Sequence, residues 1–466
     1  MSAITGRLAW VTVTTRTTDR RLIASIAVPV SLEMVVTLIL TFVNQVIVGV
    51  LGATAIAAVG FANSLIFILA ITLGALGVSV SILVARAFGG GRGDEMSHTV
   101  SAALVGAGVL AALGAIIPIL WPEQLLSVLG ASATVAAAGA DYLRLSAVAL
   151  VPTVMVAVFS GAMRSTGKAR SPMLATFVTV PLNTALAYCL VLGVGPFPNL
   201  GVAGAGWALL ITASVKLVIL AALTYGVHRI VSWQLPVGVA EWRSILVPMF
   251  VLAIPLGLTE LLWSTGTFLY NVIAQQLGDA PLAAIQIAST LEAIFIVGSV
   301  GLMSATTALV GQSVGLHEAS EARRWAGVLA RAGVYTGVVF GILLILSAFS
   351  VPLLFANAGR EVQVLAIIGI VINGLSQVIK VRNMILGAGV MPSGGDVRGV
   401  VIGDGVSAFL VGLPLALVLA LATPLGVVGL FLARVIEEAA KLAIFTMRTR
   451  RISWEAVVRR EEAITS

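Results

Sequence analysis

Long apolar runs, separated by short polar turns, recur along the whole chain. Twelve such runs lie between residues 22 and 447. A helix needs about 20 apolar residues to cross the hydrocarbon core of a bilayer. The runs lack the alternation of apolar and polar residues that is typical of membrane β-barrel strands. The pattern therefore predicts twelve transmembrane helices, at 22–48, 54–85, 98–120, 133–163, 171–194, 202–227, 245–276, 281–313, 326–352, 362–391, 399–421 and 425–447.

Composition supports lipid as the solvent for most of this chain. Of its 466 residues, 59% are hydrophobic and only 10% are charged. A soluble protein carries about 25% charged residues, which it needs to cover a surface in water. The single cysteine, Cys189, rules out an intramolecular disulfide framework.

Lysine and arginine gather on one side of the predicted topology. The loops and tails on that side hold nearly all of them outside the spans, whereas the other side holds essentially Arg360. Cytoplasmic loops of membrane proteins carry this excess of positive charge. We therefore expect a multi-pass protein of the cell (cytoplasmic) membrane with both termini in the cytoplasm. The formal charge of +7 then needs no nucleic-acid partner.

The two halves of the chain resemble each other. An offset of 226 residues pairs Pro29 with Pro255, and an offset of 225 pairs Lys216 with Lys441. Because each half holds an even number of spans, both halves enter the membrane from the same side. We predict an all-α fold of twelve transmembrane helices in two pseudo-symmetric six-helix lobes. The expected organisation is a cytoplasmic tail (1–21), an N-terminal lobe (22–228), a cytoplasmic linker (229–244), a C-terminal lobe (245–447) and a second cytoplasmic tail (448–466).

Several segments, in order and spacing, are similar to one transporter family. They are VGVLGATAIAAVG (48–60), RSTGKARSPMLATFVTVPLN (164–183), LGVAGAGWA (200–208), QQLGDAPLAAIQIA (275–288), ALVGQSVG (308–315) and GVMPSGGDVRGVVIGDGVSAFLVGLPLA (389–416). Together they resemble the bacterial members of the MATE family of multidrug and toxin extrusion transporters. The resemblance implies two lobes around a central cavity. It also implies antiport, in which an organic and often cationic compound leaves the cell as Na⁺ or H⁺ enters.

Ionisable residues inside predicted spans are the main functional candidates, because a charged side chain is costly in a membrane. Glu260 lies in the seventh span, where MATE proteins often carry a carboxylate that binds the coupling cation. Glu33 lies in the first span, which is the repeat partner of the seventh. Glu292 and Asp404 lie in the eighth and eleventh spans, and related bacterial proteins carry an acid at the Asp404 position. A buried carboxylate can hold either a proton or a sodium ion, so Na⁺ is a candidate ligand of Glu260. Asp396, at a glycine-rich break, is expected to cap a helix.

Neutral residues, an amide and an alanine, stand where the N-terminal lobe of related proteins carries acids. Many MATE members have an aspartate at the position of Asn44, and some have another at the position of Ala187. An amide cannot take up a proton near neutral pH, which places proton coupling through this lobe in doubt. Amide oxygens can still bind Na⁺ or a polar group of the substrate. The candidate polar residues are Asn44, Gln45, Asn183, Asn373 and Gln377.

The twelfth span carries four charged residues at helical spacing. Arg434 and Glu438 are four residues apart, and so are Glu437 and Lys441. Each pair shares a helix face, which predicts an internal ladder of ion pairs. Lys216 has no acidic residue four positions away, so we expect it to extend to the interface or to pair with another helix.

Three other functions are alternatives to antiport. A lipid-linked oligosaccharide or other lipid flippase of the wider superfamily is the main alternative, because Lys216, Arg434 and Lys441 could bind pyrophosphate. A channel fits the repeat less well than alternating access does. An intramembrane enzyme would need a catalytic motif, and none was recognised. We therefore expect a monomeric transporter of small molecules, not an enzyme, with no cofactor besides the coupling ion.

Overall fold

The structure, a computed structural model, describes residues 16–465, and every regular element in this range is a helix. The first half holds seven α-helices and a π-helical extension. They are α1 (Arg16–Gly49), α2 (Ala53–Gly89), α3 (Gly93–Leu120), α4 (Pro122–Val128), α5 (Ala133–Ser165), α6 (Arg170–Leu192), α7 (Val202–Ala221) and η2 (Ala222–Val227).

The second half contains the same succession of long helices, several of them interrupted. They are α8 (Val239–Gln276), α9 (Asp279–Val297), α10 (Val300–Gly315), α11 (Ala319–Ser347), η3 (Ala348–Ser350), α12 (Val351–Leu354), η4 (Ala356–Ala358), α13 (Arg360–Ile385), η5 (Leu386–Val390), α14 (Met391–Ser393), α15 (Val397–Gly405), η6 (Val406–Gly412), α16 (Leu413–Leu421), α17 (Val427–Arg450) and α18 (Trp454–Thr465).

Eleven helical segments of the described chain are long and apolar enough to cross a membrane. Five of them join consecutive elements: α7 with η2, α9 with α10, α11 with α12, α13 with α14, and α15 with α16. The twelfth spanning helix is α17, which has 24 residues but carries the charged residues of the predicted ladder. The predicted all-α fold of twelve spans is thus confirmed. The predicted cap is also present, because the Asp396 carboxylate accepts a hydrogen bond from the backbone N–H of Gly399.

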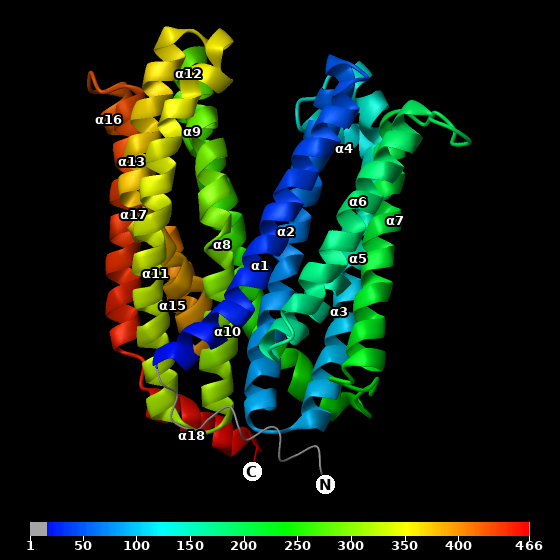
Figure 1. The fold of residues 1–466 in the computed structure, drawn as a ribbon, viewed down its shortest axis with the longest axis vertical. Coiled ribbons are helices and arrows are strands. Elements are labelled where there is room, and N and C mark those ends of the chain that lie inside the picture. Colours follow the sequence, from blue (N-terminus) through cyan, green and yellow to red (C-terminus); the bar gives the residue numbers. More distant parts are fainter. Residues whose placement is uncertain (1–15, 466) are drawn as a thin grey trace.

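The spanning helices form two lobes, one from α1–α7 and one from α8–α17 (Figure 1). The beginning of α1 and the whole of α18 lie at the same end of the molecule, which we call the terminal end (Figure 1). The lobes approach each other at this end, and their helices diverge toward the opposite end (Figure 1).

Two glycines allow the lobes to touch at the terminal end. A Cβ at Gly89 would overlap the backbone of Gln312, and a Cβ at Gly315 would overlap the backbone of Arg86. Small residues permit this close approach between helix backbones. The offset of 226 residues that pairs Gly89 with Gly315 also pairs Arg86 with Gln312. The two contacts are therefore exchanged by one operation, which confirms that the lobes are related by a pseudo-two-fold axis.

The predicted C-terminal tail contains a helix, α18, that the sequence analysis did not anticipate. Its Trp454 and Val458 are buried, and it packs against α10 and α11 of the second lobe. Glu461 of α18 accepts hydrogen bonds from Arg86, at 3.4 Å, and from Arg92, at 2.5 Å, which both belong to the first lobe. The helix thus joins the two lobes at the terminal end.

Candidate ion and substrate site

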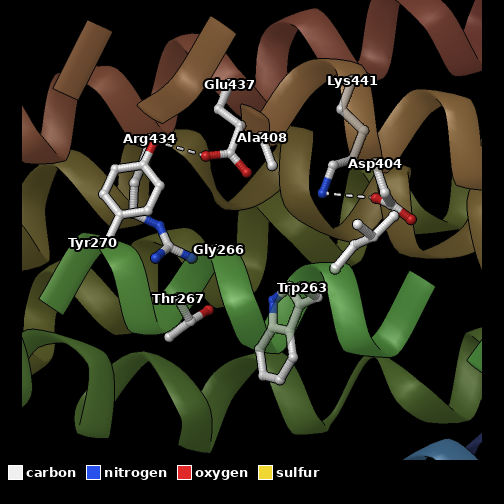
Figure 2. Close-up of a pocket in the computed structure, with 10 residues that line it drawn as sticks. Trp263, Gly266, Thr267, Tyr270, Asp404, Ala408, Arg434, Glu437 and Lys441 are labelled. Carbon is white, nitrogen blue, oxygen red and sulfur yellow. Dashed lines mark hydrogen bonds and ion pairs between the residues drawn. The ribbon is translucent and has the colours of Figure 1, made fainter. Parts of the chain in front are cut away.

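Charged side chains of three elements converge inside the second lobe. We call this group the C-lobe cluster: Glu260 of α8, Asp404 of α15, and Arg434, Glu437, Glu438 and Lys441 of α17. Its centre is Lys441, which is 8% exposed. The Lys441 Nζ lies 3.0 Å from Asp404 Oδ1 and 3.6 Å from Glu438 Oε1. Figure 2 shows the first of these ion pairs.

The rest of the α17 ladder differs from the sequence prediction. Glu437 accepts a hydrogen bond from the Tyr270 hydroxyl, with an oxygen-to-oxygen distance of 2.7 Å (Figure 2). The guanidinium of Arg434 lies 4.8 Å from the centroid of the Tyr270 ring, a cation–π contact. Within the described residues, the predicted pairs Arg434–Glu438 and Glu437–Lys441 do not form direct ion pairs, although the charges of each pair still act on each other electrostatically. Arg434 and Glu437 contact Tyr270 of the neighbouring helix α8 instead of their predicted partners in the next turn of α17.

Glu260 is the carboxylate of the cluster without a direct partner. Within residues 16–465, no hydrogen bond or ion pair joins Glu260 to another side chain, although Asp404 and Lys441 are close enough to act on it electrostatically. It lies near the midpoint of α8, a spanning helix. An ionisable group at such a depth is costly unless a partner, a proton or a bound cation compensates it.

A second set of polar contacts connects α17 to α13 and α9. Asn383 donates a hydrogen bond of 2.7 Å to Glu438 Oε2. Lys380 is 9% exposed, forms an ion pair with Glu292, and lies 3.4 Å from the Asn373 amide oxygen. Lys380 is not among the residues predicted from the sequence. A signal for it exists there, because a lysine inside an apolar span is as costly as an acid at the same depth.

The first lobe holds a smaller group that we call the N-lobe cluster: Glu33, Arg164, Thr176 and Lys216. The Glu33 side chain is 2% exposed and both of its oxygens are occupied. Oε2 accepts a hydrogen bond of 2.8 Å from Arg164, and Oε1 accepts bonds of 3.1 Å from both Lys216 and Thr176. Lys216 therefore pairs with another helix, which is one of the two outcomes expected for it. Arg164, one residue beyond the predicted fourth span (133–163), belongs to the last turn of α5.

The candidate amides lie in different surroundings and do not form one site. Asn183 is buried and donates a hydrogen bond of 2.9 Å to the Thr212 hydroxyl, but its own oxygen has no partner among the described residues. The Asn44 oxygen is likewise buried and unpartnered within 16–465, whereas Gln45 is exposed. Gln377 is 0% exposed, and neither its oxygen nor its nitrogen has a partner in the described chain. Their roles in ion or substrate binding stay predictions.

A pocket opens between α8, α15, η6 and α17, beside the centre of the C-lobe cluster. It contains about 280 Å³ of space not filled by protein atoms, including space open to the outside. The Trp263 ring lies along one part of it, near the Asp404–Lys441 pair, and Tyr270 with Arg434 lies along another (Figure 2). Its lining residues are Leu262, Trp263, Gly266, Thr267, Tyr270, Asp404, Ala408, Arg434, Glu437 and Lys441.

The histidines, which would matter for an enzyme, lie outside both clusters. His228 Nε2 is 2.8 Å from the Ser171 hydroxyl, and this contact ties the start of α6 to the segment after η2. Burial and the nearby charge of Lys168 lower the pKa of His228, which favours its neutral form. No carboxylate contacts His228 within the described residues. Among residues 16–465, no three His, Cys, Asp or Glu side chains converge as metal ligands.

The chain is similar to bacterial proteins over almost its full length. It is 26% identical over 445 residues to a probable multidrug resistance protein NorM of Bradyrhizobium diazoefficiens, and the match covers 92% of each chain. It is 30% identical over 353 residues to a probable multidrug resistance protein NorM of Rhizobium meliloti, covering 72% of this chain and 73% of that one.

Solved structures share the fold. One reported as the outward-facing conformation of a multidrug resistance MATE family transporter of the MOP superfamily superposes with a TM-score of 0.84. It is 21% identical and the match covers 95% of this chain and 96% of that one. A eukaryotic MATE transporter also gives a TM-score of 0.84 at 16% identity, covering 96% of this chain and 99% of the other.

A family model, MatE, matches the chain twice, at residues 29–189 and 255–418. The two matches begin 226 residues apart, at the two prolines that the repeat had paired. They place one family unit in each lobe and together cover most of the chain. This multi-pass membrane protein therefore belongs to the MatE family of transporters.

Proposed function

We propose that this chain exports small organic compounds, mainly cationic or amphiphilic ones, in exchange for Na⁺ or H⁺. The names of its relatives as multidrug resistance proteins support drug-like substrates. The fold of two pseudo-symmetric lobes supports alternating access, because rocking of one lobe against the other exposes a central site to each side in turn.

The distribution of lysine and arginine predicts how the protein is oriented in the membrane. With the terminal end in the cytoplasm, the basic loops and tails lie inside, as the positive-inside rule requires. In this orientation the lobes touch at the cytoplasmic side and diverge toward the outside of the cell membrane (Figure 1).

The observation that carries the proposal is the unpaired carboxylate of Glu260 beside Asp404 in the middle of the second lobe. Of the six charged residues in the C-lobe cluster, four are acids and two are bases, so the cluster has an excess of negative charge when all are ionised. Such a site attracts a proton, a sodium ion or an organic cation. Because these cations would compete for the same negative charge, entry of one favours release of another.

Purified protein in liposomes tests this function. The liposomes are loaded with ethidium, and dye exit is followed after either a Na⁺ pulse at constant pH or a pH jump without Na⁺. We expect one of the two gradients to accelerate dye exit at least 10-fold over liposomes without protein. Exit that ignores both gradients would contradict antiport. Binding of lipid-linked pyrophosphates with no binding of cationic dyes would favour the flippase alternative.

A further inference from the structure

Lys441 is a buried cation on a spanning helix that faces more acids than it can neutralise. It contacts Asp404 at 3.0 Å and Glu438 at 3.6 Å, and it also acts electrostatically on Glu260. A charged ammonium group is energetically costly at this depth in a membrane. Its position beside the candidate cation site therefore suggests a role in cation binding.

The repeat supplies a comparison. Lys216 of α7 is the sequence counterpart of Lys441, and it also meets a buried acid, Glu33, at 3.1 Å. In the N-lobe cluster, Arg164 binds the other oxygen of the same carboxylate at 2.8 Å, and Lys216 donates a further bond of 2.7 Å to Thr176. This arrangement fixes Lys216 in one place, because the one acidic contact that it makes among residues 16–465 is shared with a second cation.

The surroundings of Lys441 offer two positions instead of one. Glu438 is held in place by Asn383, which donates bonds to its side-chain Oε2 and to its backbone oxygen. Its Oε1 faces Lys441. Asp404, on α15, is the second carboxylate that contacts the ammonium group, and it lines the pocket. A displacement of Nζ from Asp404 toward Glu438 would therefore free one carboxylate without leaving the lysine unpaired.

We propose that Lys441 is a tethered cation that occupies Asp404 while the site is empty and moves onto Glu438 when a cation binds between Glu260 and Asp404. This inference rests on the proposed function and adds a positioning residue to it. The lysine partly neutralises the site while no cation is bound. It also competes with the bound cation, which promotes release.

Two substitutions test the inference, and they have opposite expected signs. The measurement is the concentration of Na⁺ at fixed pH, or of H⁺ in choline buffer, that displaces half of the bound ethidium from purified protein, with ethidium kept far below its own dissociation constant for each variant so that the midpoint reports the affinity for the ion. Lys441→Met removes the competitor, so we expect this concentration to fall at least 10-fold. Glu438→Gln removes the second position and leaves Lys441 on Asp404. We therefore expect the half-displacing ion concentration to rise at least 10-fold.

A purely structural role for Lys441 would lower the folded yield of both variants and leave the half-displacing concentration of the folded fraction within 3-fold of the starting protein. That result would overturn the inference. If Lys441→Met cannot be recovered folded, the direction of the Glu438→Gln shift decides alone. Lys441→Arg keeps the charge and is expected to stay within 3-fold, and Lys216→Met is the matched control in the other lobe, with no shift expected.

Glu260→Gln separates this inference from the proposed function. If Na⁺ and H⁺ both displace ethidium from Glu260→Gln as effectively as from the starting protein, the assignment of the cation site is wrong. The inference about Lys441 then fails with it. If Glu260→Gln weakens displacement but both Lys441→Met and Glu438→Gln leave it unchanged, only the inference about Lys441 is wrong.

Discussion

The two lobes are built on one plan but balance their buried charges in opposite ways. In the N-lobe cluster two cations, Arg164 and Lys216, share a single carboxylate, that of Glu33. In the C-lobe cluster two cations accompany four carboxylates, and Glu260 has no direct partner among the described residues. The difference teaches that the repeated scaffold fixes where charged groups gather, whereas the local ratio of acids to bases decides whether an external cation is needed.

The largest expected effect is structural and lies in the N-lobe. Glu33→Gln would leave two buried cations without their counter-charge, and we expect a loss of about 3–5 kcal/mol in the free energy of unfolding. Unfolding by SDS in mixed micelles measures this change. The exposed Glu361→Gln is the control and should be neutral. A Glu33 variant as stable as the control would show that the N-lobe cluster is not a closed ion-pair network.

A smaller effect is expected for a polar contact of the C-lobe. Tyr270→Phe removes the hydroxyl that donates to the Glu437 carboxylate at 2.7 Å. Hydrogen bonds to charged groups contribute about 1.5–3 kcal/mol, so we expect a loss in this range in the same unfolding experiment. Tyr335→Phe provides the control, because Tyr335 is 75% exposed. Equal stabilities for the two variants would mean that Glu437 finds another donor.

The smallest effect is expected where an acid is added to the N-lobe. Asn44→Asp introduces the carboxylate that many relatives carry, but Glu33 in this lobe is already balanced by two bases. We expect the number of coupling ions per exported molecule to stay unchanged. The substrate gradient that just opposes a fixed ion gradient in liposomes reports this number. An additional coupling ion in Asn44→Asp would show that the N-lobe lacks ion coupling only because this acid is missing.

Much of the fold could be predicted from the pattern of apolar runs, because each spanning helix must bury a continuous apolar surface in lipid. Even α17 was recognised, although its charges make it the least apolar span. The helix α18 was not predicted, because the arginines between residues 448 and 460 favour a basic cytoplasmic tail. The spacing of Trp454, Val458 and Glu461, three and four residues apart, could have indicated the face that the structure buries.

The partners within the candidate site were harder to predict than its members. Glu260, Asp404, Glu33 and Glu292 were singled out because acids are rare in spans, but their contacts come from helices far apart in the sequence. Glu33 and Lys216 are 183 residues apart, for example. Spacing along α17 suggested the wrong pairs because lateral neighbours such as Tyr270 compete with the next turn of the same helix. Such contacts depend on how helices pack, which a single sequence does not specify.

The central claim is that coupling takes place in the second lobe at Glu260. Its most direct test is ion-driven dye exit from liposomes that contain Glu260→Gln, Glu33→Gln or the starting protein, each normalised to its folded fraction. We expect Glu260→Gln to bind ethidium but to lose at least 10-fold of the acceleration produced by the driving ion, while folded Glu33→Gln keeps it. Full acceleration in Glu260→Gln, or its loss in Glu33→Gln alone, would contradict the account.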